Sequence, residues 1–402
     1  MTNIAVRVTA DALRQVRRGT PWVYDGSITS VAHDGDAGDL AVVFDDDRKF
    51  AAIGLWDPHS PIRIKVLHRG KPVTIDGAFW RTLLSTALDR RSGLVADAGT
   101  TGYRVVHGEN DGLPGFIADR YGDTLVVKLY TAAWFPHLDA VTAELVNLTG
   151  ARRVVLRLAR TVAAHAPDDR RDGAVLVGPP LDGPVAFRER GLSMEADVVS
   201  GQKTGHFLDQ RDNRMLVRGM AEGRTVLDVF SSTGGFALAA AAGGARSVHL
   251  VDLAAPALDA ARRNLARNEQ LGEVRRCTTR FTVGDAFDVM AKLAAADERY
   301  DIVIVDPPSF AQNQAVVDRA IRAYTRLTHL ALGVLAPGGT LVQCSCSSRV
   351  TSDQFFDAVH AAARSAKRPF IELRRTGHAV DHPIGFEHGE YLKAIYARVG
   401  GA

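Results

Sequence analysis

Apolar residues in the last two-fifths of the chain form short, nearly continuous runs, and longer amphipathic stretches separate them. Strands that are buried on both faces of a parallel sheet have this character, and helices connect such strands. The pattern therefore predicts a doubly wound α/β domain with a Rossmann-like sheet. Its expected strands are residues 225–230, 247–252, 280–283, 301–306 and 339–344.

The first 70 residues show a different pattern, in which turn signals interrupt brief apolar runs. The runs at 40–44 and 50–56 end at Asp45-Asp46-Asp47 and Asp57-Pro58, which is typical of a small β-rich module. A compositional break at Lys71-Pro72 indicates the end of this module.

The region that follows predicts a small α+β domain. Residues 75–93 have apolar positions at helical spacing, and 124–130 and 153–158 are strand-like. The stretch 166–184 is polar and rich in Gly, Pro and Asp, so we expect an exposed loop there. The chain is thus expected to hold three domains, namely 1–71, 72–190 and 191–402.

Composition narrows the class of protein. The chain of 402 residues carries a formal net charge of +3, which permits a polyanionic partner without requiring one. Its three cysteines are Cys277, Cys344 and Cys346, and no CxxC pair is present, so neither a disulfide scaffold nor a structural zinc site is expected. We find no apolar run long enough for a membrane span or a signal peptide, and we expect a cytoplasmic protein that binds no metal.

Acidic and small residues stand where four of the predicted strands end. After the first strand, Asp228 is followed by a small-residue turn that leads into a helix; this turn matches neither GxGxxG nor a P-loop. Asp252 ends the second strand and could accept both hydroxyls of a ribose. Asp285 follows the third strand, where a carboxylate could meet an adenine amino group, and Asp306 ends the fourth. Since carboxyl ends of parallel strands share one edge, these residues predict one nucleoside-binding crevice.

This arrangement resembles the class I S-adenosylmethionine methyltransferases. Asp228 and the glycine turn match the first cofactor motif, Asp252 the ribose-binding acid, Asp285 the adenine contact and Asp306 the acid beside the transferred methyl group. The resemblance implies S-adenosylmethionine as cofactor. The cofactor-binding residues expected from these motifs are Asp228, Phe230, Ser231, Thr233, Gly234, Gly235, Asp252, Asp285, Ala286 and Asp306.

Cys346 follows the fifth strand and is expected at the same sheet edge as Asp306. A thiolate that adds to carbon 6 of a pyrimidine makes carbon 5 nucleophilic enough to attack a sulfonium methyl group, which is covalent catalysis. Cys344 is expected to be a buried strand residue. Because residues two apart share a face of a regular strand, this distinction requires the strand to end or bend near Ser345. We therefore predict Cys346 as nucleophile and Asp306 as a second catalytic residue that binds the pyrimidine N3.

Longer segments resemble one bacterial family, the large-subunit ribosomal RNA cytosine-C5 methyltransferases with an N-terminal PUA domain. The similarity covers nearly the whole chain, although relatives that methylate other bases share some of these motifs. It implies that Cys346 is the nucleophile, that Phe207, Gln210 and Arg211 lie near the cofactor, and that the first module is a PUA-like β-barrel. Ser309 departs from the wider RNA cytosine-C5 enzymes, which often carry a second cysteine there. The matching segments are 18–23, 108–115, 202–212, 306–310, 345–347, 381–383 and 389–393.

The expected partner is RNA, in particular large-subunit ribosomal RNA. Basic and aromatic residues at the start of the chain could hold phosphates and stack on bases, although a solvated helix end beside core aromatics explains them equally well. The oligomeric state stays open, with a homodimer as one option. Two alternatives also remain: an exocyclic-amine methyltransferase acting on guanine N2, which needs no cysteine, and a non-catalytic RNA-binding assembly factor. The RNA-binding candidates are Arg14, Arg17, Arg18, Trp22 and Tyr24.

Overall fold

The computed structural model describes residues 2–311, 313–386 and 388–400, which divide into two compact units. The first unit holds residues 1–191, 196–208 and 380–389, and the second holds 192–195, 209–379 and 390–402. The chain therefore leaves the second unit near residue 380, adds a short segment to the first, and returns for its last strand. Both the N-terminal and the middle regions expected from the sequence belong to the first unit.

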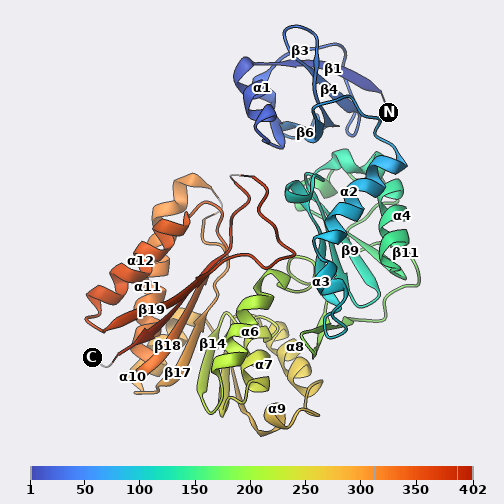
Figure 1. Ribbon diagram of the computed structural model, residues 1–402. Coiled ribbons are helices and arrows are strands. Elements are labelled where there is room, and N and C mark those ends of the chain that lie inside the picture. Colours follow the sequence, from blue (N-terminus) through green and yellow to red (C-terminus); the bar gives the residue numbers. More distant parts are fainter. Residues whose placement is uncertain (1, 312, 387, 401–402) are drawn as a thin grey trace. The chain divides into compact units, whose positions relative to one another are not determined.

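The N-terminal module is a curled six-stranded sheet with the order β2-β6-β5-β4-β1-β3 (Figure 1). Helix α1 packs on β2, β5 and β6, and its buried face closes a small apolar core with Ile4, Val23 and Ile64. The elements are β1 (Asn3–Val8), α1 (Ala10–Arg17), β2 (Trp22–Tyr24), η1 (Asp25–Ser27), β3 (Ile28–Val31), β4 (Leu40–Phe44), β5 (Phe50–Trp56) and β6 (Ile62–Arg69).

The middle region has a five-stranded sheet with the order β11-β10-β9-β8-β7, covered by α2 and α4. A small α+β domain is therefore confirmed as the architecture of this region. Two short strands, β12 and β13, form a separate two-stranded sheet. The elements are α2 (Gly77–Asp89), α3 (Ser92–Val95), β7 (Gly102–His107), η2 (Gly108–Asp111), β8 (Phe116–Tyr121), β9 (Thr124–Leu129), η3 (Ala132–His137), α4 (Leu138–Thr149), β10 (Arg153–Leu158), α5 (Arg160–Ala163), β11 (Val175–Val177), β12 (Val185–Glu189) and β13 (Leu192–Ala196).

Two predictions for this region were wrong in detail. The helix expected at 75–93 breaks into α2 and α3 because Arg91 leaves the helical path, and its fully buried guanidinium donates to the carbonyl of Ala87 and to Asp111. The stretch 166–184 is mostly irregular and exposed, as expected, but Val175–Val177 pairs antiparallel with β10 as an edge strand. Pairing there satisfies backbone groups of β10 that would otherwise lack partners.

The second unit is a seven-stranded sheet with the order β16-β15-β14-β17-β18-β20-β19, in which only the last strand pairs are antiparallel among the described residues. Helices α10, α11 and α12 cover one face, and α6 to α9 lie on the other (Figure 1). The doubly wound domain is confirmed. The elements are η4 (Leu208–Gln210), α6 (Arg211–Met220), β14 (Thr225–Val229), α7 (Gly235–Ala242), β15 (Ser247–Asp252), α8 (Ala255–Ala266), α9 (Gly272–Arg276), β16 (Thr278–Val283), α10 (Ala286–Ala295), β17 (Tyr300–Val305), η5 (Gln314–Val316), α11 (Val317–Val334), β18 (Leu335–Ser345), α12 (Ser352–Ser365), β19 (Phe370–Thr376) and β20 (Lys393–Val399).

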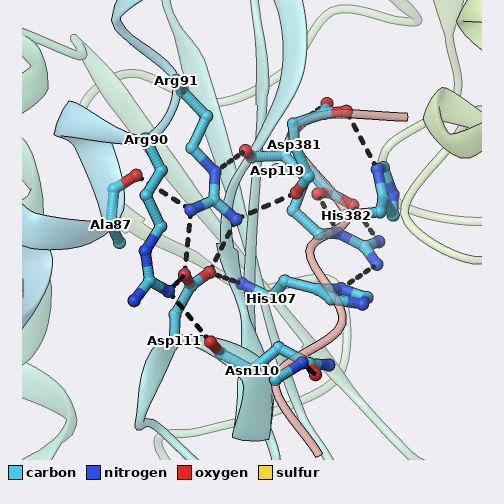
Figure 2. A network of polar contacts seen from close by, with 11 residues as sticks. Ala87, Arg90, Arg91, His107, Asn110, Asp111, Asp119, Asp381 and His382 are labelled. Carbon is cyan, nitrogen blue, oxygen red and sulfur yellow. Dashed lines mark hydrogen bonds and ion pairs between the residues drawn. The ribbon is translucent and has the colours of Figure 1, made fainter. Parts of the chain in front are cut away.

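The segment 380–389 is held in the first unit by a buried polar network (Figure 2). Arg91 donates to both carboxylate oxygens of Asp111, at 2.9 and 2.6 Å, and to the carbonyl of Asp381 at 2.9 Å. The Asp381 carboxylate in turn accepts from the backbone N–H of Arg104 at 2.9 Å. Two segments that share the family resemblance, 108–115 and 381–383, are thus joined in space although more than 260 positions separate them.

Candidate functional site

The turn after β14 has an unusual backbone. Phe230 and Ser232 have φ angles of 62° and 48°, and Gly234 has a φ of 76°. A Cβ on Gly234 would lie 2.7 Å from the Cβ of Ala261, so glycine is required both by conformation and by space. Non-glycine residues in this region cost on the order of 1–3 kcal/mol each and cluster at ligand sites. The left-handed Phe230 also explains why β14 ends one residue earlier than predicted.

Asp228 is the most deeply buried acid of the site, with 1% of its surface exposed. Its Oδ2 accepts from the Ala237 N–H at 3.1 Å, and its Oδ1 has no hydrogen-bond partner in the described part of the chain. Burial raises the pKa of this carboxyl well above the usual aspartate value, and the nearby Asp306 and Asp252 raise it further, whereas the Ala237 N–H and Arg214 oppose the shift. A buried acid that faces two further carboxylates is suited to a positively charged ligand.

The other acids lie where the sequence predicted them, at the ends of the neighbouring strands. Asp252 ends β15, and its two oxygens accept from the N–H groups of Ser232 and Ala254, at 2.8 and 2.9 Å. This carboxylate therefore fixes the turn after β14. Asp285 caps α10 by accepting from the N–H of Phe287 at 2.9 Å, which accounts for an aspartate there without any ligand. Its contact with adenine stays a prediction.

The rest of the turn is pinned by its neighbours. The Thr233 carbonyl accepts from the Asn264 side chain of α8 at 2.9 Å, and the Ser231 N–H donates to the carbonyl of Val251 at 3.1 Å. Ser231 Oγ is buried and has no hydrogen-bond partner among the described residues. Gly235 and Ala286 are the first residues of α7 and α10.

Two apolar residues that sequence reasoning missed flank these acids. Leu253 follows Asp252 directly and is 73% exposed, and Val283 lies two residues before Asp285 and is 57% exposed. Exposed large apolar side chains beside polar ligand groups are informative, because such side chains are usually buried. An apolar residue next to a strand-end acid was the signal that could have identified them.

Asp306 is held by residues of the segment that leads into α6. The side-chain amide of Gln210 donates to Asp306 Oδ1 at 2.9 Å, and its Oε1 accepts from the side-chain amide of Asn213 at 2.6 Å. Arg211, the first residue of α6, is fully buried. Gln210 and Arg211 thus belong to the unit with the acids, whereas Phe207 lies in the first unit, with the Lys203 ammonium 4.5 Å from its ring centroid.

The two cysteines of the fifth strand have different surroundings, as predicted. Strand β18 ends at Ser345, so Cys344 is a fully buried strand residue and Cys346 is a half-buried residue beyond the strand. Burial raises the pKa of the Cys344 thiol well above its usual value. Cys346 Sγ lies 3.8 Å from the carbonyl oxygen of Pro307, the residue after Asp306. The end of the strand therefore brings Cys346 to the Asp306 edge.

The expected RNA-binding residues lie in or beside α1 and β2. Arg14 and Arg17 form surface ion pairs with Asp11 and Asp45, at 3.0 and 2.8 Å, and Arg18 is exposed at the end of α1. The Trp22 indole N–H donates to Glu109 at 3.1 Å and its ring packs edge-on against Phe386, which favours a structural role. Tyr24 is 47% exposed. The RNA contacts of all five residues stay predictions.

No helix in the described ranges is long and apolar enough to cross a membrane. Within the same ranges, no group of three or more His, Cys, Asp or Glu side chains is placed to hold a metal ion.

Comparison with known proteins gives two family matches and full-length relatives. The family described as S-adenosylmethionine-dependent methyltransferase matches residues 103–381. The chain belongs to this methyltransferase family. A PUA-like domain matches residues 6–69. A ribosomal RNA large subunit methyltransferase of Deinococcus radiodurans is 45% identical over 98% of the chain and 97% of that relative. Ribosomal RNA large subunit methyltransferase I of Shewanella frigidimarina is 34% identical, with coverages of 98% and 99%.

Solved structures support the fold of this methyltransferase. A candidate S-adenosylmethionine-dependent methyltransferase from Streptococcus mutans matches 99% of the chain and 100% of that structure, with a TM-score of 0.81 and 23% identity. A second structure, of a candidate methyltransferase complexed with SAH, matches with a TM-score of 0.82 and 24% identity.

S-adenosylmethionine is the methyl donor of this family. The residues present fit it: its sulfonium and amino groups are positively charged, and the site has three acids at adjacent strand ends. Asp228 Oδ1 and Ser231 Oγ, which have no hydrogen-bond partner among the described residues, are buried polar atoms that a ligand could satisfy. Asp252, beside the strained turn, is suited to the ribose.

Proposed function

We propose that this methyltransferase modifies carbon 5 of a cytosine in large-subunit ribosomal RNA through a covalent adduct with Cys346. The position of Cys346 carries the proposal: it lies just beyond β18, 3.8 Å from the carbonyl of the residue after Asp306. The relatives' activity on large-subunit ribosomal RNA supports the substrate class.

Cys346 and Asp306 have different roles in the proposed reaction. The Cys346 thiolate forms a bond to carbon 6 of the cytosine, and the electron pair of the 5,6 double bond becomes available at carbon 5. The cofactor supplies an electrophilic methyl group for carbon 5. Asp306 holds a proton at the pyrimidine N3 as the ring becomes electron-rich, and Gln210 orients this acid through Oδ1. Loss of the carbon 5 proton to a base then expels the thiolate and restores the double bond.

The target cytosine must be unpaired or flipped out of a helix, since carbon 6 is inaccessible within a stack. A separate N-terminal module that binds RNA is consistent with this requirement. Ser309, at the place where the wider family often has a second cysteine, donates to the carbonyl of Ala311 at 3.3 Å.

RNA that contains 5-fluorocytosine tests the proposal, because fluorine cannot leave carbon 5 as a cation. We expect the adduct to persist as a protein–RNA conjugate, and Cys346→Ala to abolish both conjugate and methylation while cofactor binding is retained. Cys344→Ala is the matched control: it should keep the activity and lose on the order of 1 kcal/mol of stability through a small cavity. A fully active Cys346→Ala enzyme would refute the mechanism and favour the exocyclic-amine reaction on guanine.

A further inference from the structure

The loop that carries Cys346 connects β18 to α12 and is fixed at both ends. At its start, Ser345 pairs with Lys393 of the antiparallel strand β20, and the Ser345 hydroxyl lies 2.8 Å from the Tyr324 hydroxyl of α11. At its end, Thr351 and Gln354 form a capping box that begins α12. The position of the Cys346 thiol therefore depends on what holds the residues between these points.

A buried lysine holds the middle of this loop. Lys393 is only 3% exposed, and its ammonium donates to the carbonyl oxygens of Ser347 and Val350, the latter at 2.7 Å. An ammonium group with two carbonyl partners is well hydrogen-bonded, yet its burial is costly unless charge nearby compensates. Since Ser347 is the residue after Cys346, the lysine acts on the backbone adjoining the candidate nucleophile.

The charges around this lysine connect it with Cys346. Burial lowers the pKa of Lys393 to about 8, whereas Glu390 and Cys346 raise it. On the other side, Cys346 shares its surroundings with three groups that are neutral or negative: Asp306 after β17, Tyr324 of α11 and Cys344 of β18. A thiolate at Cys346 would be disfavoured by the negative charge of the Asp306 carboxylate and favoured by a protonated Lys393.

We propose that Lys393 is a positioning residue for Cys346, which holds the 346–350 loop through two carbonyls and favours the thiolate through its positive charge. The inference deepens the proposed function and rests on Cys346 as its nucleophile. The proton of Cys346 passes to solvent, and near neutral pH Lys393 stays mostly protonated and forms no bond to the substrate. Lys393 thereby supplies the local positive charge that a cysteine with an ordinary pKa of about 8.5 needs near neutral pH.

Alkylation of the full-length protein by iodoacetamide tests this without RNA. The rate at Cys346 is followed from pH 6 to pH 10 by mass spectrometry of the labelled peptide. We expect the midpoint to rise by roughly one pH unit in Lys393→Met, which corresponds to about tenfold slower labelling near pH 7. Lys393→Arg retains charge and donors and should stay near the wild-type midpoint. Cys277, a buried thiol distant in sequence whose pKa burial raises to about 11, serves as internal control, and its slow labelling at each pH should be the same in every variant.

Circular dichroism confirms that each variant is folded. If Lys393→Met does not fold, Lys393→Gln replaces it, because glutamine keeps amide donors without the charge, and the same rise is expected. An unchanged midpoint in the folded neutral variant, or an equal rise in Lys393→Arg, would overturn the inference. The fluorocytosine adduct separates this result from the proposed function: wild-type protein that forms no adduct refutes the function, whereas the alkylation midpoint reports on Lys393 alone.

Discussion

Replacing Asp228 by asparagine is expected to stabilise the unliganded protein and to weaken its binding of the cofactor. Asp228 is 1% exposed, has one backbone donor and has an oxygen without a partner in the described structure. Its pKa is raised by burial and by the carboxylates of Asp306 and Asp252. Asparagine resembles the protonated carboxyl in shape and removes the repulsion.

The effect of Asp228→Asn on the stability of the protein is expected to depend on pH. The folded protein holds a proton on Asp228 above the ordinary pKa of 3.8, so the stability of the wild type falls as pH rises from 3.8 to the raised value. Asparagine has no such dependence. The advantage of Asp228→Asn is therefore small near pH 4 and grows toward neutral pH, where we expect about 1–3 kcal/mol. For a unit of about 150–250 residues, each kcal/mol shifts the melting temperature by roughly 2–4 °C.

Thermal unfolding of both proteins between pH 5 and pH 8 measures this difference, and the transition of the methyltransferase unit is identified by its shift with added cofactor product. Loss of a charge-assisted hydrogen bond to the ligand should weaken binding roughly ten- to hundredfold in calorimetry. A melting temperature of Asp228→Asn that is lower than wild type at every pH, or a gain that does not grow with pH, would refute the reasoning.

Two further predictions concern the first unit. Arg91→Met removes one partner of a fully buried ion pair and should cost about 3–5 kcal/mol, whereas Arg90→Met, which removes a half-exposed arginine paired with the same Asp111, should cost at most about 1 kcal/mol. Equal melting temperatures of the two variants would contradict the structural role of the network in Figure 2. Arg18→Gln should weaken RNA binding and reduce the dependence of log K on log salt by about one unit if this arginine contacts a phosphate; a salt slope identical to wild type would exclude that contact.

The amino-acid sequence by itself determined the doubly wound domain and the acids at its strand ends. Strands buried on both faces of a parallel sheet must be apolar throughout, so their ends are visible wherever acidic or small residues begin. For this reason the sequence predicts the bounds of β15 to the residue and places Asp228, Asp252 and Asp306 at one sheet edge. Local turn chemistry likewise revealed the β-rich first module.

Only the tertiary structure determined which segments distant in the sequence contact one another. Cys344 and Cys346 occupy equivalent positions in an alternating pattern, and the end of β18 at Ser345 is what separates a fully buried cysteine from a half-buried one. Lys393 looked like one residue of a C-terminal motif, and its action on the Cys346 loop arises because β20 pairs with β18. Arg91 fits a helical pattern, yet it lies between α2 and α3, where its guanidinium binds the buried carboxylate of Asp111. The periodicity of apolar residues indicates on which face of a helix or strand a residue lies. A buried charged group, in contrast, can find its hydrogen-bond partners in any part of the chain.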